Sequence, residues 1–128
     1  MAEMSNYLED ALINGTLRGT TYTAPTTTYL ALYTSDPTDA DAGTEVTGGS
    51  YARQAITFAS PSNGVTTNSA AIEFPQATAD WGTIAYVGIR DALTSGNLLY
   101  HTALDTSKTI SNGDIFKITS GNLSVTLA

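Results

Sequence analysis

Residues 26–46, TTTYLALYTSDPTDADAGTEV, begin as a strand pattern and continue as an acidic loop marked by proline and glycine. Tyr29, Ala31 and Tyr33 alternate with two leucines, and this period of two indicates a β-strand. The segment after the strand contains four carboxylates separated by small and turn-forming residues, namely Asp36, Asp39, Asp41 and Glu45. The stretch therefore predicts a core strand followed by a long surface loop.

The composition extends the strand prediction to the whole chain. A length of 128 residues, with 41% hydrophobic and 13% charged residues, is typical of one globular domain with its own core. Abundant Thr, Ala, Gly, Ser and Tyr favour strands joined by tight turns. Further strands are expected at 51–58, 70–74, 83–90, 97–104, 114–119 and 123–127. We therefore predict a mostly β fold, an antiparallel β-sandwich over residues 20–128.

Residues 1–19 are expected to form a short N-terminal helix or arm. Ser5 can cap its start, and Gly15 and Gly19 are expected to end it. A helix of about ten residues is marginal alone, so its apolar face needs a partner, either the sheet or another subunit. The residues near that face are Leu8, Leu12, Ile13 and Leu17.

The charge and the cysteine count exclude several classes of partner and site. A net charge of −7 would repel nucleic acid and anionic membranes, so we expect neither as a partner. The absence of cysteine excludes disulfides and thiolate sites. The N-terminus lacks the basic and apolar regions of a signal peptide, and no apolar run could cross a bilayer. These features indicate a soluble, non-secreted product.

The sequence contains only weak candidates for chemistry. His101 is the only histidine and has Asp105 four residues on, but no GxSxG motif accompanies it, so a hydrogen-bonded strand histidine is favoured over a catalytic triad. Walker, HExxH and CxxC motifs are absent. We therefore predict no enzymatic activity, no cofactor and no metal.

The four acids of the loop could in principle offer oxygen ligands to Ca²⁺. The spacing does not fit an EF-hand, since counting from Asp39 places Gly43 at a ligand position and Ser50 where the bidentate glutamate belongs. A solvated loop whose charges repel one another is the favoured interpretation.

The aromatic residues favour association. Seven tyrosines and Trp81 are more amphipathic rings than one small core readily buries, so each could serve the core or an interface. Trp81 is expected at the start of a strand, where Gly82 and Gly88 permit a bend or a close backbone approach.

Five segments together resemble a family of small structural proteins of the tailed-bacteriophage virion. They are YLEDALINGTLRGTTYTAP, YLALYTSDPTDADAGTEVTGGSYARQAITF, ATADWGTIAYVGIRDA, GNLLYHTAL and ISNGDIFKITSGNLSVTL, in this order. Descriptions of that family vary between tail-fibre protein and capsid cement or decoration protein. The resemblance implies a jelly-roll-like β-sandwich that assembles as an oligomer on the virion.

The first functional prediction is a non-enzymatic capsid cement protein that bridges subunits of the major capsid protein. The alternative is a tail-fibre or tail-associated protein with tail proteins as partners, and a third reading is a small hydrolase or carbohydrate-binding module that uses His101 or Trp81. A homo-oligomer is expected, with a trimer favoured, located in the virion after synthesis in the cytoplasm of the host bacterium.

The predicted assembly contacts lie on the helix and in the loop. We expect the helix to dock through its apolar side chains and the loop to reach a neighbouring subunit. The ten residues are Tyr7, Leu8, Leu12, Ile13, Leu17, Asp36, Pro37, Asp39, Asp41 and Glu45.

Overall fold

The computed structural model describes residues 2–127 as one helix and nine strands. The fold is mostly β, which confirms the predicted antiparallel sandwich with a short N-terminal helix. In chain order the elements are β1 (Glu3–Met4), α1 (Asn6–Leu17), β2 (Thr28–Tyr33), β3 (Gln54–Ile56), β4 (Val65–Thr67), β5 (Ile72–Glu73), β6 (Gly82–Arg90), β7 (Leu98–Ile110), β8 (Lys117–Ile118) and β9 (Ser124–Thr126).

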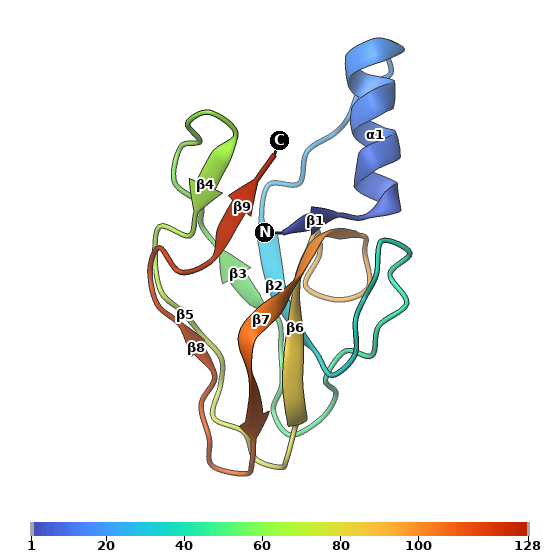
Figure 1. Cartoon of the computed structure of the whole chain (residues 1–128). Coiled ribbons are helices and arrows are strands. Elements are labelled where there is room, and N and C mark those ends of the chain that lie inside the picture. Colours follow the sequence, from blue (N-terminus) through green and yellow to red (C-terminus); the bar gives the residue numbers. More distant parts are fainter. Residues whose placement is uncertain (1, 128) are drawn as a thin grey trace.

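The main sheet has the strand order β1-β7-β6-β2-β3, and all its neighbours are antiparallel (Figure 1). The predicted strand in the opening stretch is β2, which pairs with β6 so that Leu32 lies opposite Val87. Both faces of β2 are covered, because Leu30, Ala31 and Leu32 are all fully buried. The alternation in its sequence therefore separates two buried environments rather than an inner and an outer face.

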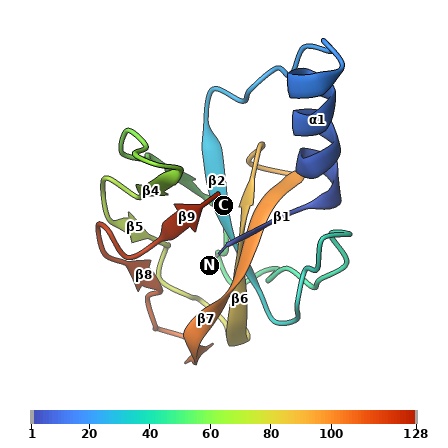
Figure 2. The same ribbon diagram turned by 45° about the horizontal axis from the view of Figure 1, so that its top comes forward.

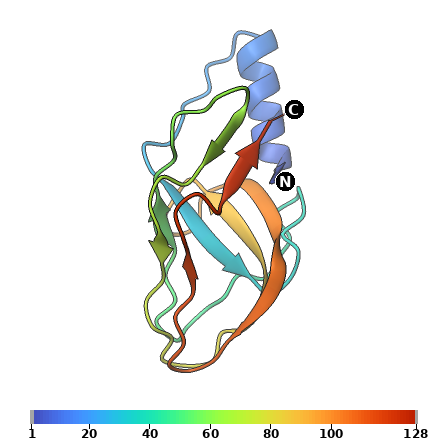
Figure 3. The same cartoon turned by 60° about the vertical axis from the view of Figure 1, so that its left-hand side comes forward.

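Two small sheets, β4–β9 and β5–β8, pack across one face of the main sheet (Figure 3). The core between the layers contains aliphatic side chains from both layers: Leu30, Leu32, Ile84, Val87, Ile89, Ile72, Leu123 and Val125. Trp81 stands in this core directly before β6, in edge contact with Tyr51 and Phe74. Its indole N–H donates a hydrogen bond to the carbonyl of Gly49 at 2.9 Å. Trp81 is thus a structural residue and is too buried to form the carbohydrate platform considered above.

Several predicted strands have different lengths in the structure. The strand expected at 51–58 is only three residues long, whereas β7 runs on to Ile110 through exposed polar residues because Gly82 and Thr83 continue to pair with it. Strands β1 and β4 were not anticipated, because such short segments contain no clear alternation. Among residues 2–127 the strands form sheets of five, two and two, and the jelly-roll prediction is not confirmed.

The helix begins as predicted and ends between the two glycines that were expected to end it. Ser5 is the N-cap, and its hydroxyl accepts a hydrogen bond from the Leu8 N–H. Gly15 lies inside the helix, which ends at Leu17, and Gly19 follows with a φ of +70°. Of the two glycines, Gly15 does not end the helix, because a single glycine lowers the stability of a helix without breaking it.

The N-terminal segment joins the main sheet before the helix starts. β1 pairs with β7 at its edge and leads directly into α1 (Figure 2). From there α1 extends beyond the end of the main sheet (Figures 1 and 3). The division into residues 1–19 and 20–128 stays a prediction. No helix within residues 2–127 has the length and apolar character needed to cross a membrane.

Candidate functional site

The acidic loop, residues 34–46, covers the face of the main sheet that lies opposite the core. Leu30 and Leu32 point into the core, so Ala31, Tyr33 and the neighbouring Gly88 occupy the other face. The loop is ordered by its own backbone bonds, including that from the Thr34 N–H to the Thr44 carbonyl at 3.0 Å. Because its acids reach basic groups on this face, the loop is the candidate site.

The first anchor of the loop joins Glu45 to the buried guanidinium of Arg53. Two parallel bonds of 2.8 Å link Nε and one terminal nitrogen of Arg53 to the two oxygens of Glu45. The Tyr51 hydroxyl donates a further bond of 2.7 Å to Glu45. The other terminal nitrogen of Arg53 donates to the carbonyls of Ala92 and Ser95 in the β6–β7 connection. The pair therefore ties the loop end to the residues just before β3 and to the β6–β7 connection.

The second anchor joins Asp41 to Arg90, the last residue of β6. Both terminal nitrogens of Arg90 bond to the Asp41 carboxylate, at 2.8 and 2.9 Å, and one of them also bonds to the Tyr33 hydroxyl at 2.9 Å. The other terminal nitrogen reaches the Gly96 carbonyl at 3.0 Å. This bidentate arrangement holds the middle of the loop against the sheet.

These bonds shift the pKa values of the groups involved. Burial acts to raise the pKa of Glu45, but hydrogen bonds from Arg53 and Tyr51 outweigh burial and leave it below its ordinary value. Burial and the bond to Glu45 raise the pKa of Tyr51. Burial acts to lower the pKa of Arg90, yet its bonds with Asp41 and Tyr33 hold it above the ordinary value. All three groups therefore keep their usual protonation states at neutral pH.

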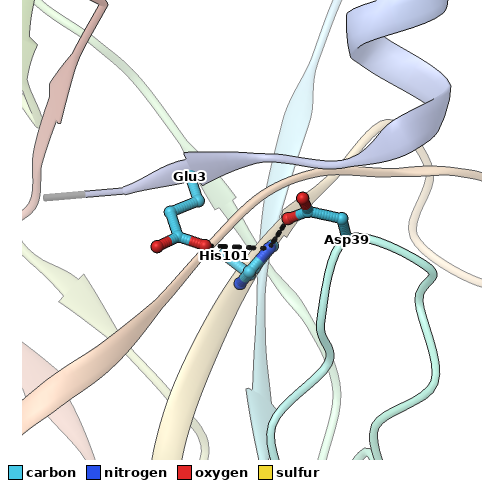
Figure 4. A group of neighbouring side chains, drawn as sticks. All are labelled: Glu3, Asp39 and His101. Carbon is cyan, nitrogen blue, oxygen red and sulfur yellow. Dashed lines mark hydrogen bonds and ion pairs between the residues drawn. The ribbon is translucent and has the colours of Figure 1, made fainter.

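The third anchor is a bond between His101 of β7 and Asp39 (Figure 4). His101 Nε2 lies 2.7 Å from Asp39 Oδ1 and 4.0 Å from Glu3 Oε2, while Nδ1 lies 4.0 Å from Asp36 Oδ1. The predicted hydrogen-bonded strand histidine is confirmed. Its carboxylate partner is Asp39 and not the sequence neighbour Asp105, so the pairing considered for a triad is not formed.

The loop is solvated as predicted, because most of its residues are exposed, but the prediction that its charges repel one another is wrong. Asp39, Asp41 and Glu45 each bond to a different histidine or arginine, and Asp36 accepts a bond from the Thr38 N–H at 2.9 Å. Asp41 and Glu45 pair with separate arginines, while Asp36 and Asp39 lie beside His101, so the four acids do not form one group of oxygen ligands for calcium. Arg53 and Arg90 were not predicted as site residues. The one sign of them in the sequence is that each is the single charged residue of a predicted strand, 51–58 or 83–90.

The ten predicted assembly residues fall into separate groups in the structure. Leu8 and Pro37 are buried within the chain, so they are not on the surface of this subunit. On the helix, Tyr7, Ile13 and Leu17 are exposed, and Leu17 has 79% of its surface accessible. The helix start meets the loop through a backbone bond from the Asn6 N–H to the Asp39 carbonyl. Whether the exposed members contact another subunit stays a prediction.

Among the described residues, one group could hold a metal ion: Glu3, Asp39 and His101. Of the other acids of the loop, Glu45 and Asp41 pair with the two arginines, and Asp36 accepts the Thr38 N–H. Thus the loop is fixed to the sheet at three points and presents no group of side chains arranged for catalysis around a nucleophile.

Comparison with known protein families gives a match over residues 3–126 to the family described as "Podophage GP4 fiber I protein gp80" (Gp80). The chain belongs to the Gp80 family. This Gp80-family protein is a structural protein of the bacteriophage virion, which confirms the resemblance seen in the sequence. A comparison with curated proteins found no match.

The family description bears on the two placements considered for the protein. It names a fibre, in agreement with the tail-fibre alternative, and it leaves the capsid cement prediction unconfirmed. In this Gp80-family protein the three anchors hold the acidic loop in one position on the sheet.

Proposed function

We propose that the chain is a non-enzymatic subunit of a podophage tail fibre, a compact module that connects to other virion proteins and assembles as a homo-oligomer. The observation that carries the proposal is the match of residues 3–126 to a fibre protein family. The sequence contains no repeat of the kind that builds a fibre shaft, so a terminal knob or adaptor is the better fit.

The helix supports a role in association. Its first turn is fixed to the body because Ser5 and Leu8 are buried and the Ser5 N–H donates to the Leu99 carbonyl. Farther along, Ile13 and Leu17 lie one turn apart, and both are exposed. A rigidly attached helix that presents apolar side chains to solvent gains stability when a partner covers them.

The proposed oligomer is a trimer in which each helix packs against a neighbouring subunit. A closed symmetric assembly repeats each contact, so a modest contact per subunit yields a stable ring. The fixed acidic loop would form the rim of the interface with tail proteins. The placement of the helix and the loop at interfaces is supported by the exposure of their side chains and by the match to a fibre protein family.

Immunogold electron microscopy of the source virion tests the placement. Antibodies raised against this chain are expected to label the tail, while antibodies against the major capsid protein provide the matched head marker. Label distributed over the head with the same pattern as the marker would contradict the proposal and would favour the capsid cement instead.

A further inference from the structure

We propose that Glu3, Asp39 and His101 form a binding site for one divalent transition-metal ion, for which Zn²⁺ is the best match. The proposal concerns a site that the family description does not mention, and it holds wherever the protein sits in the virion. The three side chains come from β1, the acidic loop and β7, so an ion bound between them would join three separate segments.

The donor atoms are close enough to share an ion. His101 Nε2, one Asp39 oxygen and one Glu3 oxygen all lie within 4.8 Å of one another. Zinc lies about 2.0–2.2 Å from nitrogen and carboxylate ligands, so its ligand atoms are separated by roughly 3–3.6 Å. The Glu3 side chain is 71% exposed and can rotate inward to close the set. Figure 4 shows both carboxylates directed at the same imidazole nitrogen.

The second nitrogen of His101 provides an independent indication. Nδ1 lies 4.0 Å from Asp36 Oδ1, which is longer than a hydrogen bond, and a small movement of the half-exposed Asp36 side chain would join the two. In metal sites the histidine nitrogen that does not bind the ion commonly donates its hydrogen to a carboxylate, which orients the ring. The ring is 6% exposed and is held within β7, so its orientation is already set before an ion binds. This arrangement distinguishes the group from a simple cluster of acids.

The charge around His101 favours a cation. Three carboxylates surround one imidazole, and within residues 2–127 none of the three forms an ion pair with a lysine or arginine. The two buried arginines are already bonded to Glu45 and Asp41. The single imidazole carries at most one positive charge and cannot balance three carboxylates. A dication would offset more of this local negative charge.

The donor types select the class of ion. Calcium and magnesium prefer oxygen ligands alone, whereas an imidazole nitrogen together with carboxylates suits zinc and its first-row neighbours. Three protein ligands leave a fourth position, which opens into a shallow hollow of about 420 Å³ lined by these residues and by Asn6 and Thr38. Water can fill that position, as in other zinc sites with three protein ligands.

Nuclear magnetic resonance offers a direct test, because His101 is the only histidine in the sequence. The imidazole nitrogens of a tag-free, ¹⁵N-labelled chain would be followed during titration with ZnCl₂. We expect Nε2 to shift and to saturate at one ion per chain, together with a rise in melting temperature. CaCl₂ at the same concentrations is expected to leave both unchanged.

Matched variants separate a specific site from general binding to an acidic protein. Glu3→Gln is expected to weaken zinc binding strongly, and Asp36→Asn to weaken it about 10- to 100-fold through the orientation of the ring. Glu73→Gln makes the same chemical change on β5, at an exposed residue outside the cluster, and should bind zinc as the wild type does. All of these side chains are at the surface, so the spectra would show folded protein.

Two results would overturn the proposal. One is an imidazole spectrum that does not change at millimolar zinc. The other is an unaltered zinc affinity in both Glu3→Gln and Asp39→Asn, which would mean that any ion bound lies elsewhere.

Discussion

Arg53 and Arg90 are charged residues inside a small β protein, and each is neutralised by one carboxylate of the acidic loop. Removing one partner of such a pair leaves a buried charge without compensation, which costs more than the intact pair contributes. At the scale of the residue, the loop acids are therefore counterions for the sheet. Their substitution should reduce the stability of the fold.

Glu45→Gln is expected to destabilise the protein by about 2–4 kcal/mol, because it removes the charge that Arg53 needs and weakens a bidentate bond. Urea denaturation would measure the difference. Glu73→Gln, an exposed acid on β5, is the matched control and should remain within about 0.5 kcal/mol of the wild type. Equal midpoints for the two variants would show that the Arg53 pair does not stabilise the fold.

The Glu45 pair also predicts a dependence on pH. The pKa of Glu45 is lowered in the folded protein relative to the ordinary value of 4.5, so its ionisation stabilises the fold above that value. This contribution is lost as pH falls through the folded pKa. The difference in unfolding free energy between wild type and Glu45→Gln should therefore shrink between neutral pH and about pH 3. A difference that stays constant over this range would contradict the assignment.

Gly88 permits a close approach in the middle of β6, as the sequence suggested. A Cβ there would lie 2.8 Å from Leu98 Cδ1 and from Tyr33 Cε2. Gly88→Ala should therefore cost about 1–3 kcal/mol in thermal or urea unfolding through overpacking. Gly15→Ala in α1 is the comparison, since its Cβ meets nothing closer than 3.4 Å, and it should instead be neutral or stabilise the helix. If both substitutions lowered the free energy of unfolding by similar amounts, the close approach at Gly88 would not explain the loss.

At the scale of the element, α1 is anchored at one end only. The Ser5 hydroxyl accepts the Leu8 N–H and donates to the Leu98 carbonyl on β7, so one side chain both caps the helix and ties it to the sheet. Leu8 is the only buried residue of the helix. The direction in which α1 leaves the body therefore depends on Ser5 and Leu8.

Ser5→Ala should destabilise the protein by about 1–2 kcal/mol, because it removes both the helix cap and the bond from the hydroxyl to the Leu98 carbonyl. Circular dichroism during urea unfolding would measure the change. Thr16→Ala is the control, since that hydroxyl donates to the Leu12 carbonyl on the exposed side of the same helix. If both variants unfold at the same urea concentration, Ser5 does not have the anchoring role.

At the scale of the whole molecule, a sandwich with a projecting helix has two distinct ends. The segment between β7 and β8 lies at the end opposite α1 (Figure 1). Ile13 on the helix and Ile115 in that segment are almost equally exposed, at 53% and 51%. Substituting each isoleucine in turn therefore tests whether the oligomer forms through the helix or through the opposite end of the molecule.

Ile13→Asp is expected to shift the proposed oligomer to monomer in light scattering coupled to size-exclusion chromatography, because it places a charge in an apolar contact. Ile115→Asp should leave the mass unchanged. Circular dichroism would verify that both variants are folded. An unchanged mass for Ile13→Asp would remove the helix from the oligomer interface, and loss of the oligomer in both variants would point to a non-specific effect.

Local features of the sequence were sufficient for much of this protein. The strand β2, the Ser5 cap, the position of Trp81 before β6 and the mostly β class all follow from patterns within a few residues. The virion family was also evident from ordered segments that span nearly the whole chain. Such features are readable because period, capping and turn chemistry depend on near neighbours along the chain.

The tertiary structure alone decided which polar groups meet. Asp39 and His101 are 62 positions apart, Asp41 and Arg90 are 49 apart, and the short strand that brings Glu3 to His101 has no periodic signal. The sequence thus suggested a repelling loop, whereas the fold pairs Glu45 and Asp41 of the loop with buried arginines. The reason is physical: hydrophobic periodicity is local, whereas the pairing of buried charges depends on how the sheet brings distant segments together.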